Sequence, residues 1–279
     1  MVTTLAAMVV IPTHDHASTL GLSVASALEQ TIPDLDIVVL GDGVGDDTRA
    51  VMADLCRADS RVRFVDRPKG EGRNEVLRHE VVSAATAPVV TYLGDDDLFL
   101  PTHVETILDL LADHDFAHPF PVFVGVGGEL IARPTDLSDE RCVRWHLHPR
   151  RNTISLTGAA HTMDLYRRLP AGWRPAPPDR WSDHFMWEQI FSLPGVRLAT
   201  SPDATTIKPP ADMRAGMSAA ARRDELARWW ARMHEPGFTL WWDGAVQAAI
   251  RRVAVDAYRD TFDLLETVER ARHTATASP

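Results

Sequence analysis

Short apolar runs alternate with helical patterns through the first hundred residues of the chain. The apolar runs cover residues 5–11, 36–40, 62–65 and 89–93. Between them, apolar residues recur at helical spacing over 18–30, 47–58 and about 74–85. Strands and helices that alternate in this way predict an α/β fold, with a doubly wound, mostly parallel sheet and helices on both of its faces.

The pattern after Pro101 is less regular. The proline can open a helix that reaches about residue 113, and a hairpin is expected around Gly127-Gly128. The polar stretch 134–151 receives no assignment. Later predicted elements are a short helix that is entered from 157–161 and ends near 169, a helix over 182–193, a strand over 196–200, a long loop over 201–218 and two helices within 219–272. The turn between the last two helices is surrounded by Trp229, Trp230, Trp241 and Trp242.

Polar and charged residues follow directly after the predicted strands. In chain order they are Pro12, Thr13, Asp42, Lys69, Asp95, Asp96 and Asp97. Because the carboxyl ends of parallel strands meet at one edge of a sheet, these residues are expected to form one ligand site. Three adjacent carboxylates repel one another, and a hard divalent cation shared with substrate phosphates would relieve that repulsion. The alternative interpretation is a solvated acidic loop.

Composition and charge narrow the classes of function. The 279 residues are 45% hydrophobic and 24% charged, as is typical of a soluble globular protein. A net charge of −10 argues against nucleic acid or an anionic membrane as the main partner. The two cysteines form neither a disulfide framework nor a zinc site, and the apolar run 5–11 is far shorter than a membrane span. We therefore expect a cytoplasmic protein with no integral membrane segment.

Several short motifs together resemble the family-two glycosyltransferases of the GT-A fold. The matching segments, in order, are 9–14, 27–39, 42–48, 72–74 and 92–97. The resemblance covers roughly residues 5–113 and is looser from 114 to 200. It implies a GT-A domain over 1–205, with a nucleotide-binding half (1–113) and an acceptor half (114–205). Residues 206–279 then form a loop and a helical C-terminal extension.

The family transfers a sugar from a nucleotide-diphosphate donor to an acceptor nucleophile with inversion, and uridine is its commonest base. By resemblance, Pro12 and Thr13 pack against the base, and Asp42 hydrogen-bonds the base and ribose. Arg73 and Asn74 likewise resemble residues that help to fix the nucleotide.

The acidic triplet corresponds to the family's Asp-x-Asp metal motif, which implies Mn²⁺ or Mg²⁺. The family often has an aspartate at the position of Gly94, and Asp95 is its expected replacement at the ribose. That leaves Asp96 and Asp97 as the metal ligands. A second departure is Gly41-Asp42-Gly43-Val44, where the family often has Asp-Asp-Gly-Ser.

The family's catalytic base is a carboxylate at the start of a helix well after the metal motif. Asp183 fits that place best, and Asp179 and Glu188 are the competitors. An aspartate at a helix start is also a common cap, so both interpretations of Asp183 stay open.

Two cationic residues on the loop 201–218, Lys208 and Arg214, are possible members of a diphosphate lid, although a solvated role is the alternative. The tryptophan cluster is read as core or as a homodimer contact through the C-terminal helices. The histidine pairs 14/16 and 146/148 lack ligands at metal-site spacing and are read as surface residues. The acceptor is expected to be a small molecule or a glycan, selected by residues 134–180 and the helical tail.

Two other functions stay open at this point. One is a nucleotidyltransferase that makes nucleotide sugars, although the glycine-rich basic loop typical of that class is missing after the first predicted strand. The other is a homologue that binds nucleotide sugars without catalysis, which the departure at Gly94 would favour.

Overall fold

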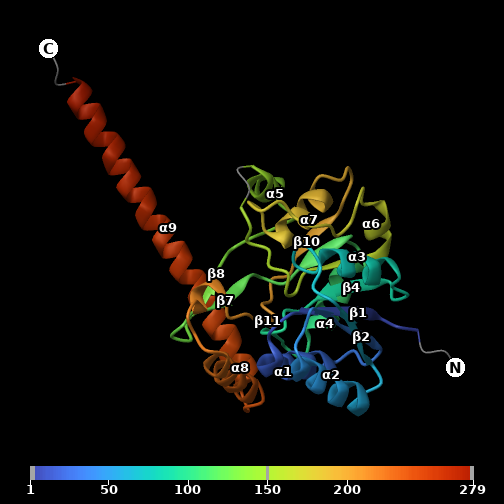
Figure 1. The fold of residues 1–279 in the computed structure, drawn as a ribbon. Helices are drawn as coiled ribbons and strands as arrows, with labels where there is room; N and C mark the ends of the chain where they lie inside the picture. Colours follow the sequence, from blue (N-terminus) through green and yellow to red (C-terminus); the bar gives the residue numbers. More distant parts are fainter. Residues whose placement is uncertain (1–3, 149–150, 277–279) are drawn as a thin grey trace.

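The computed structural model describes residues 4–148 and 151–276, and its centre is a seven-stranded sheet (Figure 1). The strand order is β10-β6-β9-β4-β1-β2-β3. The predicted nucleotide-binding half begins with β1 (Ala7–Thr13), α1 (Ala17–Leu28), β2 (Leu35–Asp42), α2 (Asp46–Ala58), β3 (Val62–Arg67), α3 (Glu75–Ser83) and β4 (Val89–Tyr92). These four strands are parallel, which confirms the predicted doubly wound α/β arrangement.

The elements that follow β4 complete the sheet and add short strands outside it. Its elements are β5 (Leu98–Phe99), α4 (His103–Leu111), β6 (Phe116–His118), β7 (Val122–Val124), β8 (Leu130–Ala132), α5 (Glu140–Leu147), β9 (Ala160–Thr162), α6 (Met163–Arg168), α7 (Ser182–Phe191) and β10 (Leu198–Thr200). The predicted hairpin around Gly127-Gly128 is confirmed, because β7 and β8 pair antiparallel. The sheet's β9 runs antiparallel between β4 and β6.

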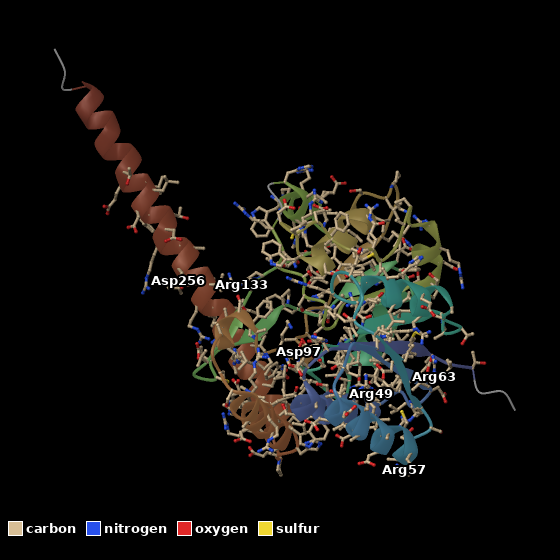
Figure 2. The ribbon with its side chains drawn as sticks, in the orientation of Figure 1. Arg49, Arg57, Arg63, Asp97, Arg133 and Asp256 are labelled. Carbon is tan, nitrogen blue, oxygen red and sulfur yellow. The ribbon has the colours of Figure 1, made fainter. Side chains whose placement is uncertain are left out.

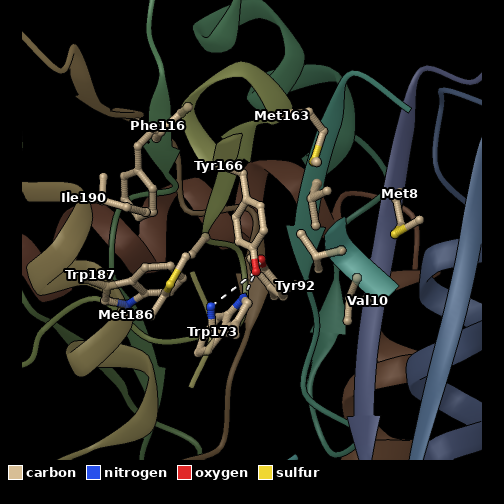
Figure 3. Close-up of a cluster of buried hydrophobic side chains, with 14 of the residues drawn as sticks. Met8, Val10, Tyr92, Phe116, Met163, Tyr166, Trp173, Met186, Trp187 and Ile190 are labelled. Carbon is tan, nitrogen blue, oxygen red and sulfur yellow. Dashed lines mark hydrogen bonds between the residues drawn. The ribbon is translucent and has the colours of Figure 1, made fainter. Parts of the chain in front are cut away.

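Alternate residues of the central strands build two cores, one on each face of the sheet. Val9 and Ile11 of β1 face a layer made by α1, α2 and α4, whereas Met8 and Val10 face α3, α6 and α7. Figure 3 shows the second core, where Tyr92 lies among large side chains of the acceptor half. Successive side chains of a strand point to opposite faces of the sheet, and both faces of this sheet are buried, so apolar residues occur at consecutive positions.

The acceptor half corrects the sequence prediction in two places. Residues 160–162 form the antiparallel strand β9, although they were expected to lead straight into a helix. Residues 116–118 form β6, where no strand was predicted. Each strand has only three residues and contains a histidine, so neither makes an apolar run that sequence periodicity can detect.

The C-terminal extension is joined to the body of the protein. It starts with β11 (Thr206–Ile207), which pairs with β5, and a short 3₁₀ turn (Asp212–Arg214). Then α8 (Ala219–Met233) packs against α1, and the start of α9 (Phe238–Thr276) packs against β8. The two predicted helices are thus confirmed, and Trp229 and Trp242 are buried in a third core that joins them to β7 and β8.

The far part of α9 projects away from the body of the molecule (Figure 1). None of the helices within residues 4–148 and 151–276 has the length and apolar character that crossing a bilayer requires.

Candidate active site

A cavity of about 450 Å³ opens at the carboxyl ends of β1, β2 and β4. Its lining includes all six residues predicted to contact the nucleotide: Pro12, Thr13, Asp42, Arg73, Asn74 and Asp95. The structure brings these six together because their loops follow neighbouring parallel strands, or lead into the helix after one. The cavity therefore lies where an α/β sheet binds its ligands.

The carboxylate of Asp42 is held on one wall of this cavity. Lys69 Nζ lies 2.5 Å from Asp42 Oδ2, and the backbone N–H of Gly70 donates to Oδ1 at 2.8 Å. Asp42 is buried, so these partners satisfy a charge that burial would otherwise penalise. The pair also fixes the loop between β3 and α3 against the end of β2.

A tight turn presents Arg73 and Asn74 to the cavity. Asn74 has a left-handed backbone, with φ of 69°, and its side-chain Nδ2 donates to Leu40 O at 3.0 Å. The backbone N–H of Arg73 donates to a carboxylate oxygen of Glu75 at 2.5 Å. These bonds anchor the turn to β2 and to α3, while the Arg73 side chain stays exposed at the cavity.

Arg78 is a cavity residue that the sequence analysis missed. It lies one turn along α3, is buried, and stacks with its guanidinium carbon 4.2 Å from the ring centre of Trp173. One of its nitrogens donates to Arg73 O at 3.2 Å, and its Nε has no partner among the described residues. Burial lowers the pKa of Arg78. A buried guanidinium with a spare N–H donor on the wall of this cavity suits an anionic ligand.

Two carboxylates of the acidic triplet converge with a histidine from the loop after β1. Side-chain oxygens of Asp95 and Asp96 and a ring nitrogen of His16 all lie within 4.8 Å of one another. His16 Nδ1 is 2.8 Å from Asp95 Oδ1, and this bond raises the pKa of His16 to about 8. His16 is half-buried, and its carboxylate partner is so distant in sequence that no local spacing could reveal it. The surface interpretation was wrong for His146, which is buried.

This donor set suits a divalent cation. Carboxylate oxygens are the ligands that Mg²⁺ and Mn²⁺ prefer, and an imidazole nitrogen is also acceptable to Mn²⁺. The group stands at the rim of the cavity, since His16 and Asp95 also line it. The residues present therefore fit a metal ion that would meet a bound diphosphate.

Asp97 turns away from this group and into the protein. Its side chain is fully buried, accepts a hydrogen bond from the Thr157 hydroxyl, and lies 2.7 Å from Lys208 Nζ. Burial raises the pKa of Asp97. Burial alone would lower the pKa of Lys208, but the nearby carboxylates outweigh it and raise that pKa above its usual range. Figure 2 shows Asp97 in the interior, between the sheet and the C-terminal region. The two predicted metal ligands thus separate, with Asp96 in the group of His16 and Asp97 in an internal ion pair.

The same geometry explains the departure at Gly94. A Cβ at this position would lie 2.5 Å from Asp97 Oδ2 and 3.1 Å from Thr157 Oγ1. The backbone N–H of Gly94 donates to that threonine oxygen at 2.9 Å. A side chain here would displace the buried pair of Asp97, so glycine is the residue that this local arrangement admits.

Asp183 lies in the first turn of α7, beyond the cap position, and its Oδ1 accepts a hydrogen bond from the backbone N–H of His184 at 2.8 Å. The cap position is Trp181, and no side chain caps the helix there. Instead, Asn152 Nδ2 donates to Asp183 Oδ1 at 2.9 Å, and burial raises the pKa of Asp183 against the opposing charges of Lys208 and Arg78. Asp183 therefore faces the same charged region as the acidic triplet.

The two competing carboxylates are placed differently. Glu188 pairs with Arg180 and lies 3.7 Å from His184 Nδ1. Asp179 is exposed, on the loop before α7. Glu188 is half-buried like Asp183 but is paired with Arg180, whereas the positive charges that act on Asp183 are those of Lys208 and Arg78.

The two cations of the predicted lid also separate. Arg214 is buried, and its guanidinium binds Glu225 and the carbonyls of Val124 and Gly125. These bonds explain why the structure does not bring Arg214 to the site. Lys208 is at the site, but as the buried partner of Asp97.

A different cation, Arg222 of α8, reaches the acidic group. Its Nη1 lies 3.2 Å from His16 Nε2, and its Nη2 lies 3.9 Å from Asp96 Oδ2. On sequence alone Arg222 looks like one of many charges on a helix surface. Only the packing of α8 against α1 brings it to the loop after β1.

The fold is an α/β fold of the GT-A type, with a cavity at the carboxyl ends of its parallel strands. The chain belongs to glycosyl transferase family 2, whose family model matches residues 8–171.

Two curated proteins illustrate the range of its relatives. The chain is 30% identical over 133 residues to the GalNAc(5)-diNAcBac-PP-undecaprenol beta-1,3-glucosyltransferase of Campylobacter jejuni subsp. jejuni. The aligned residues make up 47% of this chain and 40% of that protein. It is 32% identical over 108 residues to the chondroitin synthase of Pasteurella multocida, and these residues make up 38% of this chain and 11% of that protein. The matched parts are thus less than half of these relatives.

Solved structures share the fold. S. aureus TarS 1–349 in complex with UDP aligns with a TM-score of 0.58 and 15% identity, over 85% of this chain and 75% of that one. The mannosyltransferase PcManGT from Pyrobaculum calidifontis, in complex with GDP-Man and Mn²⁺, aligns with a TM-score of 0.52 and 18% identity, over 97% of this chain and 81% of that one.

Proposed function

We propose that this protein transfers a sugar from a nucleotide-diphosphate donor, with UDP as the nucleotide, to a hydroxyl of a small molecule or glycan. The observation that carries the proposal is the position of His16, Asp95 and Asp96 at the rim of the cavity that contains all six predicted nucleotide residues. This arrangement supports a nucleotide in the cavity with its diphosphate at the acidic group. Both structural neighbours described above were solved with a nucleotide bound.

In this proposal Asp95, Asp96 and His16 would hold Mn²⁺ or Mg²⁺, which would supply positive charge to stabilise the negative charge on the departing diphosphate. Arg78 and Arg222 supply further positive charge on two sides of the site. Such fixed cations matter because the chain itself is strongly acidic.

Asp183 is the proposed base that takes the proton of the acceptor hydroxyl, with inversion at the sugar carbon. Its partner Asn152 lines a second cavity of about 380 Å³, between β7, β8 and the 3₁₀ turn. Apolar side chains such as Phe123 and Met213 share that lining with Arg133. A mixed lining of this kind supports binding of the acceptor next to the base.

The test is a titration with UDP, with and without Mn²⁺, followed by thermal unfolding. A ligand at about a hundred times its dissociation constant stabilises a protein by about 2.7 kcal/mol. We expect Asp96→Ala to abolish the Mn²⁺-dependent part of this stabilisation. Asp54→Ala, at an exposed carboxylate of α2, is the matched control and should behave like the parent chain.

Four outcomes would count against the proposal. Unchanged metal dependence in Asp96→Ala would place the cation elsewhere. No response to UDP or to other nucleoside diphosphates would remove the nucleotide from the cavity. Binding of UDP-sugar without release or transfer of sugar, whichever acceptor is offered, would favour a non-catalytic binding protein. Formation of a nucleotide sugar from a nucleoside triphosphate and a sugar phosphate would favour a nucleotidyltransferase.

A further inference from the structure

The segment 151–154, which follows α5, is fastened along one side of α7. His184 Nε2 donates to the carbonyl oxygen of His146 at 2.9 Å, and Trp187 Nε1 donates to Ile154 O at 3.1 Å. Positions three apart on a helix lie on the same side, so both contacts hold the segment against one face of α7. The side chains of this segment therefore have fixed places beside the start of the helix.

A buried histidine sets the conformation of the segment itself. His146 Nδ1 donates to Arg151 O at 2.7 Å, and His146 Nε2 lies 3.0 Å from the Thr153 hydroxyl. Burial lowers the pKa of His146, so the ring is neutral and one of its nitrogens can accept from that hydroxyl. Asn152 lies between these two anchored residues, and its amide is therefore held in place from both sides.

The side chain of Asn152 serves a single partner. Its Nδ2 donates to Asp183 Oδ1 at 2.9 Å. An ionised carboxylate only accepts hydrogen bonds, so the NH₂ end of the amide must face Asp183. The amide oxygen then lies on the other side, where it is buried and receives no hydrogen bond from residues 4–148 and 151–276. Within that part of the chain, the bond to Asp183 is the only hydrogen bond of this side chain.

The two oxygens of Asp183 differ in their contacts. Oδ1 accepts from Asn152 Nδ2 and, at 2.8 Å, from the backbone N–H of His184. Oδ2 accepts no hydrogen bond from the residues that the structure describes. The half-buried carboxylate therefore has one oxygen bound to the protein and the other available to a proton donor from outside.

Asp183 also lies between the two cavities described above. Its partner Asn152 lines the second cavity, whereas Arg78, whose positive charge acts on the carboxylate, lines the cavity of the predicted nucleotide residues. The charged and titratable groups that face Asp183 are Lys208 of the loop after β11, Arg78 of α3 and His184 of α7. The carboxylate thus stands between a wall residue of each cavity.

We propose that Asn152 is a positioning residue for the base, because it holds Oδ1 of Asp183 and so leaves Oδ2 to receive the proton of the acceptor hydroxyl. The inference rests on the proposed function, in which Asp183 is the base. In the reaction, the acceptor oxygen bonds to the sugar carbon, the bond from that carbon to the diphosphate breaks, and the diphosphate leaves with the electron pair. The hydroxyl proton goes to Oδ2.

The same hydrogen bond also keeps the base in its working state. Burial raises the pKa of Asp183 and thus favours the protonated form, which cannot take up a further proton. A donor to the carboxylate favours the charged form. Asn152 thereby opposes the effect of burial.

The first experiment measures kcat against pH for the parent chain and for Asn152→Ala. Loss of one hydrogen bond to a charged group should lower kcat about ten- to a hundredfold near neutral pH. The acidic limb, where kcat falls as Asp183 is protonated, should move to higher pH by about one to two units. UDP affinity should not change, because Asn152 is not part of the lining of the nucleotide cavity. Asn152→Asp places a second carboxylate beside Asp183 and should move the limb further.

Thr135→Val is the matched control. The Thr135 hydroxyl lies 2.8 Å from the Thr153 hydroxyl, so the variant loosens the same segment without touching Asp183. It should lower the free energy of unfolding and leave the acidic limb where it is. An equal shift of the limb in Thr135→Val and Asn152→Ala would mean that Asn152 acts only through the fold, and it would overturn the inference.

The second experiment does not depend on turnover. Carbon-13 NMR of the Asp183 carboxyl group, whose signal is identified by its loss in Asp183→Asn, follows the protonation of that group directly. We expect the midpoint to rise in Asn152→Ala and to rise further in Asn152→Asp. An unmoved midpoint in an active enzyme would overturn this inference alone. A parent chain that transfers no sugar to any acceptor would overturn the proposed function, and the role of Asn152 with it.

Discussion

The two halves of the central sheet solve the same packing problem in different ways. In the nucleotide-binding half, β1 to β4 are parallel and are buried mainly through Val, Ile, Leu and Met side chains. In the acceptor half, β6, β9 and β10 have only three residues each, and β9 is inserted antiparallel. The first half is held by continuous apolar strands, and the second depends on specific polar contacts.

Those contacts are visible around β9. The ring of His161 lies 2.7 Å from the Tyr92 hydroxyl, which also accepts a hydrogen bond from Trp173 Nε1 at 2.8 Å. Thr157 and Lys208 both bind Asp97 at the end of β4. Asp97 therefore ties the acceptor half and the C-terminal loop to the nucleotide-binding half. The comparison teaches that the cavity at the ends of β1, β2 and β4 is built on apolar strands, while the region beside it is held by buried polar side chains.

The strongest test of this contrast is Asp183→Asn, which alters chemistry in the acceptor half and leaves the nucleotide site intact. Loss of the proton acceptor should lower turnover by about a hundred- to ten-thousandfold. The amide keeps the size of the side chain, so UDP affinity and the free energy of unfolding should change little. Steady-state kinetics and calorimetry on the same preparations measure both quantities.

Asp179→Asn and Glu188→Gln are the controls, because neither carboxylate shares the surroundings of Asp183. Both should keep most of the activity of the parent chain. Full activity in Asp183→Asn with loss in either control would move the base to that neighbour. Full activity in all three variants would exclude a single carboxylate base from this group.

The nucleotide-binding half is also the part that sequence reasoning predicts well. Its strands β1, β2 and β4 are mainly apolar, and the six residues that were predicted to contact the nucleotide line one cavity. Physical proximity there is set by neighbours in the sequence, because each loop joins a strand to the next helix.

The remainder could not be predicted because its contacts span long distances along the chain. Lys208 meets Asp97 from 111 residues away, so no local pattern tells which carboxylate of the triplet turns inwards. Arg222 comes from a helix outside the matched motifs, 206 residues from His16. The strand β9 has a histidine at its centre, and only its partners Tyr92 and Phe116 give that residue a buried role.

A second prediction concerns the ion pair that joins the halves. Lys208→Met leaves Asp97 as an unpaired buried charge, and breaking such a pair typically costs about 3–5 kcal/mol of stability. Chemical denaturation should show this loss, and it should shrink as the pH falls, because protonation of Asp97 removes the unpaired charge.

The double variant Asp97→Asn with Lys208→Met provides the control for that measurement. It removes both charges, so it should recover much of the loss, and the coupling between the two positions can be read from the cycle. Additive effects of the two substitutions would show that Asp97 and Lys208 do not act as a pair. Loss of Mn²⁺ binding in Asp97→Asn, with stability retained, would make Asp97 a metal ligand instead.

The smallest expected effect concerns the buried histidines, all of which lie after the nucleotide-binding strands. Burial lowers the pKa of His103 to about 3 and those of His118 and His161 to about 4. In the unfolded chain these groups take up a proton as the pH falls below about 6.5, whereas in the folded protein they stay neutral until far lower pH. Above about pH 6.5 these histidines are neutral in both states and leave the free energy of unfolding at its full value. As the pH falls from there towards 4, each of them lowers that free energy.

Each such histidine steepens the fall in unfolding free energy by up to about 1.4 kcal/mol per pH unit in that window. His161→Gln keeps a polar side chain next to Tyr92 but removes the titrating group, so the slope between about pH 6 and 5 should become shallower by up to that amount. His148→Gln is the matched control, because its exposed side chain is not desolvated on folding. Urea unfolding at several pH values measures the slope for each variant. Equal slopes for His161→Gln and the parent chain would mean that this histidine takes up its proton without unfolding, and that the acceptor half tolerates charge where its packing indicates that it should not.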